Sequence, residues 1–447
     1  MELKGILRVV IAQAIVVLPL AAAGSDYQDA EELAPTSAQE ASVGLQGVET
    51  ERILAPTRAV LEDLLANAPP FWRDTKSSLR IRTFDFRRDN DEITIGDATA
   101  AGFELAVDSG KWRDSLSLSL SWSTSYGVDA PEGLGQTGVL GPDQSDISVL
   151  SRAFAQWDFS DASHVRLYRQ EFNMPYINRQ DSRMIPSTYE AYVFQHSGER
   201  LQGVLGHVTK MKRRDSDKFV SMGEIAGVSG NDNGTSVVGL QYEWESGLMI
   251  GALAQHTRDL FTTTYSETSY NYEFSEDWGT QLAAQLTNQW SVGTQLLGDF
   301  NTYAWGLRGK LSYRGAVLTL ASTSIGSDGI RRPFGGSPGY TSSMIANFDR
   351  ARERGTRFGL SQNFETYGLP GVSVTLNYTK GSDAVSALGV PLDDEDEFNV
   401  TADYRPEKGL LKGLWFRIRY GELDRGAPTA NRRDLRIIVN YRLSAFQ

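Results

Sequence analysis

Arginine side chains recur at every second position in several segments of this sequence, a spacing that suits the binding of anions. Arg417 and Arg419 occur in "GLWFRIRYG". On a β-strand, alternate side chains project from one face about 7 Å apart. Guanidinium groups are always charged and can bind a carboxylate through two hydrogen bonds, so such a row offers an anion a series of similar sites. Further members of the predicted basic row are Arg436 and Arg442, Arg308, Lys310 and Arg314, and Arg166.

Residues for covalent or metal chemistry are scarce. The chain has no cysteine, and its four histidines are scattered. We therefore expect no disulfide, no thiolate metal site and no Ser-His-Asp triad. The acidic run "PLDDEDEF" lacks the spacing of an EF-hand, and the glycine-rich "GSDGIRRPFGGSPG" lacks the lysine of a phosphate-binding loop. The sequence predicts neither an enzyme nor a bound metal or cofactor.

Strict alternation of polar and apolar residues indicates the elements that carry the arginines. In "SLSLSLSWSTSYG" (115–127), serines occupy the odd positions, whereas leucines and then Trp122, Thr124 and Tyr126 occupy the even ones. Period two is typical of a β-strand. A soluble sandwich would bury the leucines, whereas a membrane barrel would turn them toward lipid and line its interior with the serines. This stretch alone favours neither architecture.

Length and composition narrow the choice of architecture. The chain has 447 residues, 40% of them hydrophobic, and a mean hydropathy of −0.34, which excludes a polytopic helical membrane protein. Aromatic residues make up 10%, and the 43 glycines suit twisted sheets with many turns. The net charge of −12 does not indicate a basic partner, because the acidic residues gather in segments that we expect to be loops. No nucleic-acid partner is predicted.

From residue 77 onward, the lengths of the connections between predicted strands alternate. Long segments follow the first (87–97), third (128–150) and fifth (172–188) strands, whereas turns such as "SGER", "ESG" and "YRG" are short. We predict an all-β, transmembrane antiparallel β-barrel of about eighteen strands with external loops, because such barrels have even strand numbers and this asymmetry of connections. One segment departs from the pattern. In "SLRIRTFDF", Phe84 and Phe86 share the face of the arginines, which requires a bulge near Thr83 or aromatic residues inside the barrel.

The N-terminal segment is typical of an exported protein. Residues 1–23 combine Lys4 and Arg8, an apolar run and three alanines, which predicts a secretory signal peptide. Residues 24–76 form an acidic leader with a possible short helix at 48–65, and either a periplasmic segment, a plug or a disordered leader fits this composition. The barrel is expected to occupy residues 77–447.

Several segments carry a family resemblance. They are "FGGSPGYTSSMIANFDRARE" (334–353), "RQDSRMIPSTYEA" (179–191), "GLPGVSVTLNYTKG", "EFNVTADYRP" and the tail "KGLWFRIRYGELDR…DLRIIVNY". Together they resemble the OprD-type family of bacterial outer-membrane porins, the carboxylate-selective channels. The resemblance covers about residues 77–443, and its motifs are specific as a set rather than singly.

This resemblance implies a function and a set of site residues. Members of the family are eighteen-stranded, usually monomeric barrels in which loops fold inward and a row of basic residues guides small carboxylates to a constriction. Arg417, Arg419 and Arg436 match the basic row of the last two strands, and Arg183 and Tyr340 fall in loops that approach the pore. The last strand would meet the barrel-assembly machinery, although the chain ends in Gln447 after Phe446 rather than in an aromatic residue.

By strand alternation, two carboxylates face the same interior as the predicted arginines. Asp403 and Glu104 are expected to form the opposite wall and to hold an ammonium group, or else to pair with the arginines and brace the wall. The alternatives to a carboxylate channel in the bacterial outer membrane are a barrel that acts through its loops, as an adhesin or an enzyme, and a channel for neutral oligosaccharides.

Overall fold

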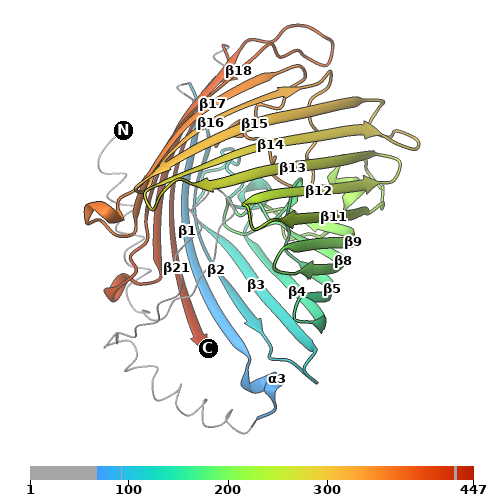
Figure 1. The fold of residues 1–447 in the computed structure, drawn as a ribbon, viewed down its shortest axis with the longest axis vertical. Coiled ribbons are helices and arrows are strands. Elements are labelled where there is room, and N and C mark those ends of the chain that lie inside the picture. Colours follow the sequence, from blue (N-terminus) through green and yellow to red (C-terminus); the bar gives the residue numbers. More distant parts are fainter. Residues whose placement is uncertain (1–67, 92, 427–429, 447) are drawn as a thin grey trace.

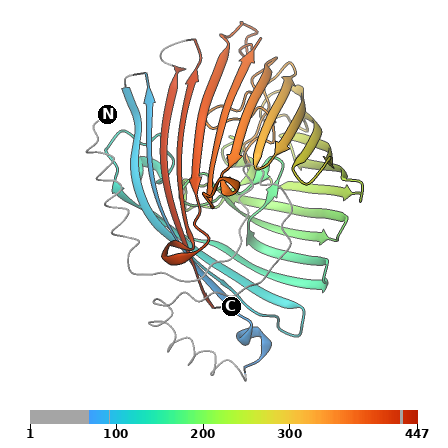
Figure 2. The same cartoon turned by 60° about the vertical axis from the view of Figure 1, so that its left-hand side comes forward.

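The computed structural model describes residues 68–91, 93–426 and 430–446, and these form a closed antiparallel barrel (Figure 1). Its sheet contains nineteen strands, one of which, the two-residue β10, only prolongs the pairing of β9, so eighteen strands form the wall. The wall closes because β1 pairs with β21, from Ser77 opposite Phe446 to Asp89 opposite Arg433. Figure 2 shows these first and last strands side by side, in blue and red. The predicted all-β barrel is confirmed.

The strands follow one another around the wall in chain order. The first nine are β1 (Lys76–Asn90), β2 (Ile93–Asp108), β3 (Leu116–Asp129), β4 (Ile147–Ser160), β5 (Ser163–Gln170), β8 (Thr188–Ser197), β9 (Leu201–Lys212), β11 (Thr235–Glu243) and β12 (Leu248–Thr257). The other nine are β13 (Phe261–Glu273), β14 (Trp278–Ser291), β15 (Asn301–Tyr313), β16 (Ala316–Ile325), β17 (Arg354–Asn363), β18 (Val372–Ser382), β19 (Glu395–Tyr404), β20 (Leu414–Asp424) and β21 (Arg432–Phe446).

The remaining elements are short. A hairpin of β6 (Asn173–Met174) and β7 (Ile177–Asn178) lies in the connection after β5, and β10 (Val220–Ser221) precedes helix α4 (Met222–Ile225). Helix α3 (Pro70–Arg73) precedes β1, and single turns occur at η1 (Pro142–Gln144), η2 (Glu365–Tyr367) and η3 (Gly409–Leu411). Within the described ranges, no helix has the length and apolarity needed to cross a membrane. The predicted signal peptide and the possible helix at 48–65 lie outside the described residues.

The wall turns its apolar side chains outward. On β3, Leu120 and Trp122 are 49% and 51% exposed, whereas Ser121 and Ser123, on the opposite face, are 1% and 0% exposed. The Ser151 hydroxyl from β4 lies 2.9 Å and 2.7 Å from the hydroxyls of these two serines, inside the barrel. The serine face is thus interior and hydrogen-bonded, and the leucine face is the one that meets lipid.

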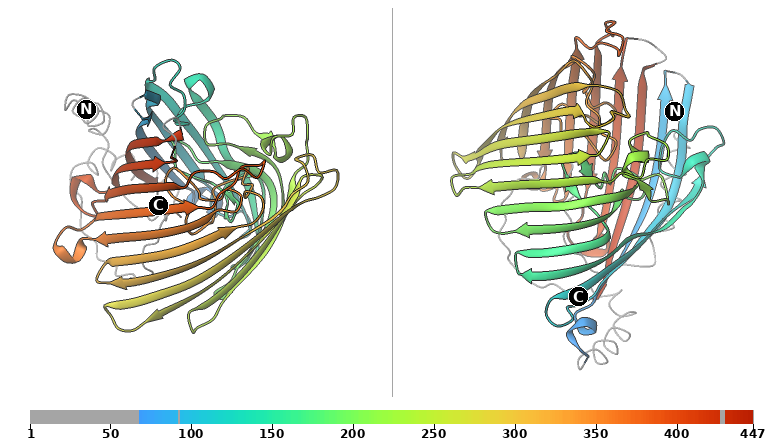
Figure 3. Two further views of the ribbon diagram at one scale, coloured as in Figure 1. Left: turned by 90° about the horizontal axis from the view of Figure 1, so that it is seen from above. Right: turned by 90° about the vertical axis from the view of Figure 1, so that its right-hand side faces the viewer.

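Long connections gather at one end of the barrel, opposite the end where β1 begins and β21 ends. They include 130–146, 171–187, 213–234, 292–300, 326–353 and 383–394. Seen from above in Figure 3, coil segments lie inside the ring of strands. The prediction of a long connection after the first strand (87–97) is wrong, because β1 extends to Asn90 and β2 begins at Ile93. There, Arg87 pairs with Asp89 and Thr94, so polar side chains prolong the ladder after the apolar alternation has ended.

Phe84 and Phe86 depart from the predicted alternation because both rings lie inside the barrel. The register of β1 with β2 does not shift near Thr83, which excludes the bulge. Both rings are 1% or less exposed and pack with Val139, Ile185 and other apolar side chains from loops inside the lumen. The guanidiniums of Arg88, Arg183 and Arg436 lie 5.2, 4.8 and 4.7 Å from the centre of the Phe86 ring. The barrel therefore has its core between its loops and its inner wall.

Candidate functional site: a constriction with a basic wall

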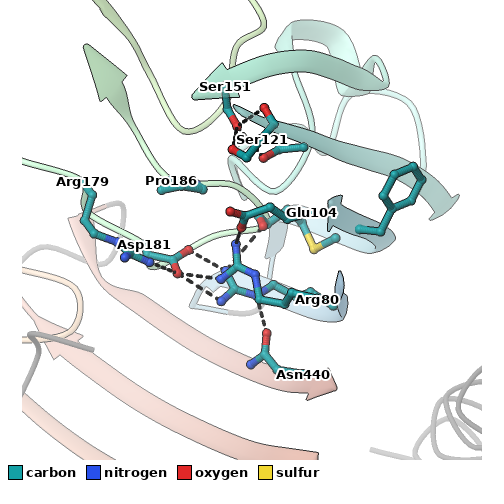
Figure 4. Close-up of polar contacts among 12 residues, drawn as sticks. Arg80, Glu104, Ser121, Ser151, Arg179, Asp181, Pro186 and Asn440 are labelled. Carbon is teal, nitrogen blue, oxygen red and sulfur yellow. Dashed lines mark hydrogen bonds and ion pairs between the residues drawn. The ribbon is translucent and has the colours of Figure 1, made fainter. Parts of the chain in front are cut away.

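The connection 171–187 is fixed inside the barrel by one buried carboxylate. Asp181 accepts hydrogen bonds from Arg80 Nη1 at 2.9 Å and from Arg82 Nη1 at 2.6 Å, both on β1, and from Arg179 Nη2 at 2.7 Å (Figure 4). Burial would raise the pKa of Asp181, but these guanidiniums hold it well below its usual range. Asp181 therefore stays ionised and attaches the loop to the wall.

The connection 326–353 is attached to the inner wall by a second carboxylate, which lies on β19, three strands from β1. Glu397 on β19 is fully buried and accepts backbone N–H groups from Met344 at 2.7 Å, Ile345 at 3.0 Å and Ala346 at 2.7 Å. Further along this loop, the Tyr340 hydroxyl donates to Glu267 Oε1 on β13 at 2.8 Å. Both long loops thus enter the lumen and narrow it.

Between the two loops and the wall lies a cavity of about 680 Å³. Its cationic lining comes from β1, β15, β20 and β21 and from the loop 171–187. The basic side chains concerned are Arg82, Arg308, Arg417, Arg419, Arg436, Arg179 and Arg183. Four of the eight residues predicted for the basic row, Arg308, Arg417, Arg419 and Arg436, therefore face one cavity, and the predicted loop residues Arg183 and Tyr340 line it as well.

On β20, the two predicted arginines have different partners. Arg417 binds Asp403 through Nε at 2.7 Å and Nη2 at 3.1 Å, and its guanidinium lies 4.6 Å from the centre of the Trp415 ring. Arg419 donates from Nε to the Thr401 hydroxyl at 3.1 Å. Asp403 therefore neutralises part of the charge of Arg417.

The other lining arginines are held by neighbouring groups. Arg436 donates to Asp434 at 2.7 Å and to the Met344 carbonyl at 3.2 Å. Arg308 lies over the Tyr340 ring at 4.1 Å and 4.0 Å from Glu267. Each guanidinium is thus oriented by the wall or by a loop before any solute arrives.

Arg183 braces a loop. It donates to the carbonyls of Thr137 at 2.6 Å and Ser182 at 2.8 Å. Burial, together with the nearby cations of Arg214, Arg436 and Arg88, lowers the pKa of Arg183 well below its usual value.

Several predicted side chains lie away from the cavity. Lys310 points inward from β15 but does not line the cavity. Arg166 donates to Gln156 at 2.7 Å, nearer the end of the barrel where β1 begins and β21 ends. Arg314 is not on the inner face at all, because β15 ends at Tyr313 and Arg314 sits in the exposed turn, paired with Asp277 at 2.9 Å. Arg442 is half-buried on β21 outside the cavity lining.

The carboxylates expected on an opposite wall are both paired with arginine. Asp403 binds Arg417, as described above, and Glu104 accepts from Arg80 at 2.5 Å. Their contacts correspond to wall bracing, and neither lines the cavity.

Important residues of the site escaped the sequence analysis. Arg80 and Arg82 sit on the arginine face of "SLRIRTFDF". The pairing of β1 with β21 that closes the barrel sets Arg80 opposite Arg442 and Arg82 opposite Asn440, so a barrel closed in this register would have placed both arginines beside the predicted row. Asp181, Glu267 and Glu397 carried no local signal, because each contacts residues far away in the sequence.

One further carboxylate in the loop 171–187 titrates near neutrality. Glu171 lines the cavity and lies 3.1 Å from Arg179. Burial first, and then the charge of Glu104, raises the pKa of Glu171 to about 7, although Arg80 and Arg152 oppose the shift. The charge of the constriction therefore varies with pH.

A closed antiparallel barrel with an apolar outer wall, a polar lumen and inward-folded loops is the architecture of a bacterial outer-membrane porin. The sequence profile of the family described as "outer membrane porin, OprD family" matches residues 69–445. The chain belongs to the OprD family of outer-membrane porins. The resemblance stated from sequence and the outer-membrane location are thereby confirmed.

Individual relatives are distant in sequence and close in fold. Porin D of Pseudomonas aeruginosa is 24% identical over 433 residues, which cover 85% of this chain and 93% of that protein. The crystal structure of P. aeruginosa OccK9 (OpdG) superimposes with a TM-score of 0.78 at 21% identity, and that of a BenF-like porin from Pseudomonas fluorescens Pf-5 with 0.76 at 18%. The structure of P. aeruginosa OpdK with vanillate gives 0.76 at 20%. Each of these three covers 84% of this chain and 100% of the other.

Proposed function

We propose that this porin passes small carboxylate-containing solutes by passive diffusion, and that Arg417, Arg419 and Arg436 guide the carboxylate. The observation that carries the proposal is the cluster of guanidiniums from adjoining strands around one narrow cavity. Arg419 lies directly across from Arg436 in the strand register. A carboxylate can move between neighbouring cations without losing all of its hydrogen bonds at once, which conduction requires.

Relatives of the chain support the same class of solute. OpdK, which shares the fold, was solved with vanillate, a molecule that carries a carboxylate. The family consists of porins, which are channels rather than enzymes. The lumenal serines of β3 and β4 form hydrogen bonds with one another rather than with a histidine. The small solutes would enter from the long-loop end, and the apolar wall would meet outer-membrane lipid.

The test compares a carboxylate with its neutral amide in single-channel recordings. In a planar bilayer, hexanoate should interrupt the KCl current at a concentration about tenfold lower than hexanamide, because only hexanoate gains charge-assisted hydrogen bonds. Arg419→Gln should raise the half-blocking concentration of hexanoate by about tenfold. Arg314→Gln, in the exposed turn, is the matched control and should change nothing. Equal block by hexanoate and hexanamide would refute the proposal.

A further inference from the structure

The side of the cavity opposite β20 and β21 is uncharged. Among the described residues that line it, those from β8, β9, β11 and β12 include no aspartate, glutamate, lysine or arginine. They include three glutamines instead, Gln195, Gln202 and Gln241. The lumen is therefore divided into a guanidinium side and an amide side, and a solute in the cavity faces both.

The strand register brings these amides together. Gln202 on β9 lies directly across from Gln241 on β11 and, on its other side, from Ser197 on β8. Gln195 is two residues from Ser197 and so shares its face. Neighbouring strands are about 4.8 Å apart, so Ser197, Gln202 and Gln241 form a row across three strands, which Gln195 extends along β8.

The amides in this row have capacity to bind a solute. Gln195 Oε1 lies 3.1 Å from His164 Nε2, which leaves its NH₂ group for another partner. Gln202 is exposed and Gln241 is half-buried, and neither side chain makes a hydrogen bond to another described residue. Beside Gln241 lies Gly251, where an added Cβ would be 3.6 Å from the Gln241 stem. Water or a solute must therefore satisfy these amides.

Given the carboxylate function proposed above, we propose that this row, Gln195, Gln202 and Gln241, binds hydroxyl groups, and that the favoured solutes are polyhydroxy carboxylates such as sugar acids. A hydroxyl both donates and accepts, as an amide does, so a polyhydroxy chain can replace the water on the row bond for bond. An alkyl or aryl carboxylate displaces the same water and leaves the amides unpaired, which is unfavourable. The carboxylate lies on the arginines in both cases, so the amide row alone distinguishes the two solutes.

The experiment compares gluconate with hexanoate, two six-carbon carboxylates, as blockers of the KCl current through single channels of the full-length porin. The half-blocking concentration of gluconate should be about fivefold below that of hexanoate. In the double variant Gln202→Leu with Gln241→Leu, the ratio of the two concentrations should fall below about twofold. In Gln202→Asn with Gln241→Asn, which keeps shorter amides, part of the preference should remain. Heat-dependent gel mobility verifies that each variant forms the barrel.

The outcomes separate this inference from the proposed function. Gln362→Leu, on β17 outside the cavity, is the control and should retain the wild-type ratio. Hexanoate at least as effective as gluconate in the wild type, or an unchanged ratio in the leucine variant, would overturn the hydroxyl site while leaving carboxylate selection intact. If neither acid blocks better than hexanamide, the carboxylate function itself fails.

Discussion

Replacing Glu397 by glutamine should loosen the constriction. The carboxylate accepts backbone N–H groups from three consecutive residues, Met344, Ile345 and Ala346, at distances between 2.7 and 3.1 Å. A hydrogen bond to a charged group contributes about 1.5–3 kcal/mol, roughly twice a neutral one. Glutamine keeps one neutral acceptor and turns an NH₂ group toward N–H donors, so we expect a net loss of about 3 kcal/mol. That loss raises the fraction of detached loop about a hundredfold.

Single-channel recording in about 1 M KCl, where exposed charges are strongly screened, measures this change. Glu397→Gln should show brief excursions to a higher conductance that the wild type lacks, because the loop 326–353 can leave the lumen. Tyr340 still holds the loop through Glu267, so the barrel stays folded and the excursions are transient. Glu422→Gln, an exposed glutamate on β20, is the matched control. Identical conductance and current noise in Glu397→Gln and wild type would refute the assignment of Glu397 as the anchor of this loop.

Three other perturbations test the interior of the barrel. Asp181→Asn leaves the buried Arg80 and Arg82 without their shared anion and should lower the free energy of unfolding in urea by about 3–5 kcal/mol; a loss below about 1 kcal/mol would show that the ion cluster is dispensable. Phe86→Ala removes a fully buried ring and should lower the same free energy by about 3–5 kcal/mol, and wild-type stability would contradict the lumenal core. The pKa of Glu171, about 7, lies above its unfolded value, so ionisation disfavours the folded state and stability should fall as pH rises through 7. Between pH 6 and pH 8 the half-blocking concentration of hexanoate should also rise, and Glu171→Gln should abolish both trends.

Alternation in the sequence predicted the wall because the physical rule behind it is local. One face of each strand meets lipid and the other meets water, so Leu120 and Ser121 identify the two faces without any knowledge of the fold. The same parity placed Arg308, Arg417, Arg419 and Arg436 inside. It failed for Arg314, because a turn ended the strand one residue earlier.

The constriction could not be predicted in the same way. The contacts of Asp181 with Arg82 and of Glu397 with Met344 join residues 99 and 53 positions apart, and neither depends on a local pattern. The tight turn after β1 was missed for a related reason. Polar contacts of Arg87, with Asp89 on the same strand and with Thr94 on β2, prolong the strand beyond the apolar alternation. Loop positions depend on long-range pairing that composition does not reveal.

Influx of radiolabelled gluconate and sorbitol into proteoliposomes tests carboxylate selection most directly, because the two six-carbon polyols differ in the carboxylate alone. Gluconate should enter faster than sorbitol through the wild-type channel. The double variant Arg417→Gln with Arg419→Gln should remove the difference, because it removes two of the cations that line the cavity. Sorbitol influx equal to or faster than gluconate influx in the wild type would contradict the account.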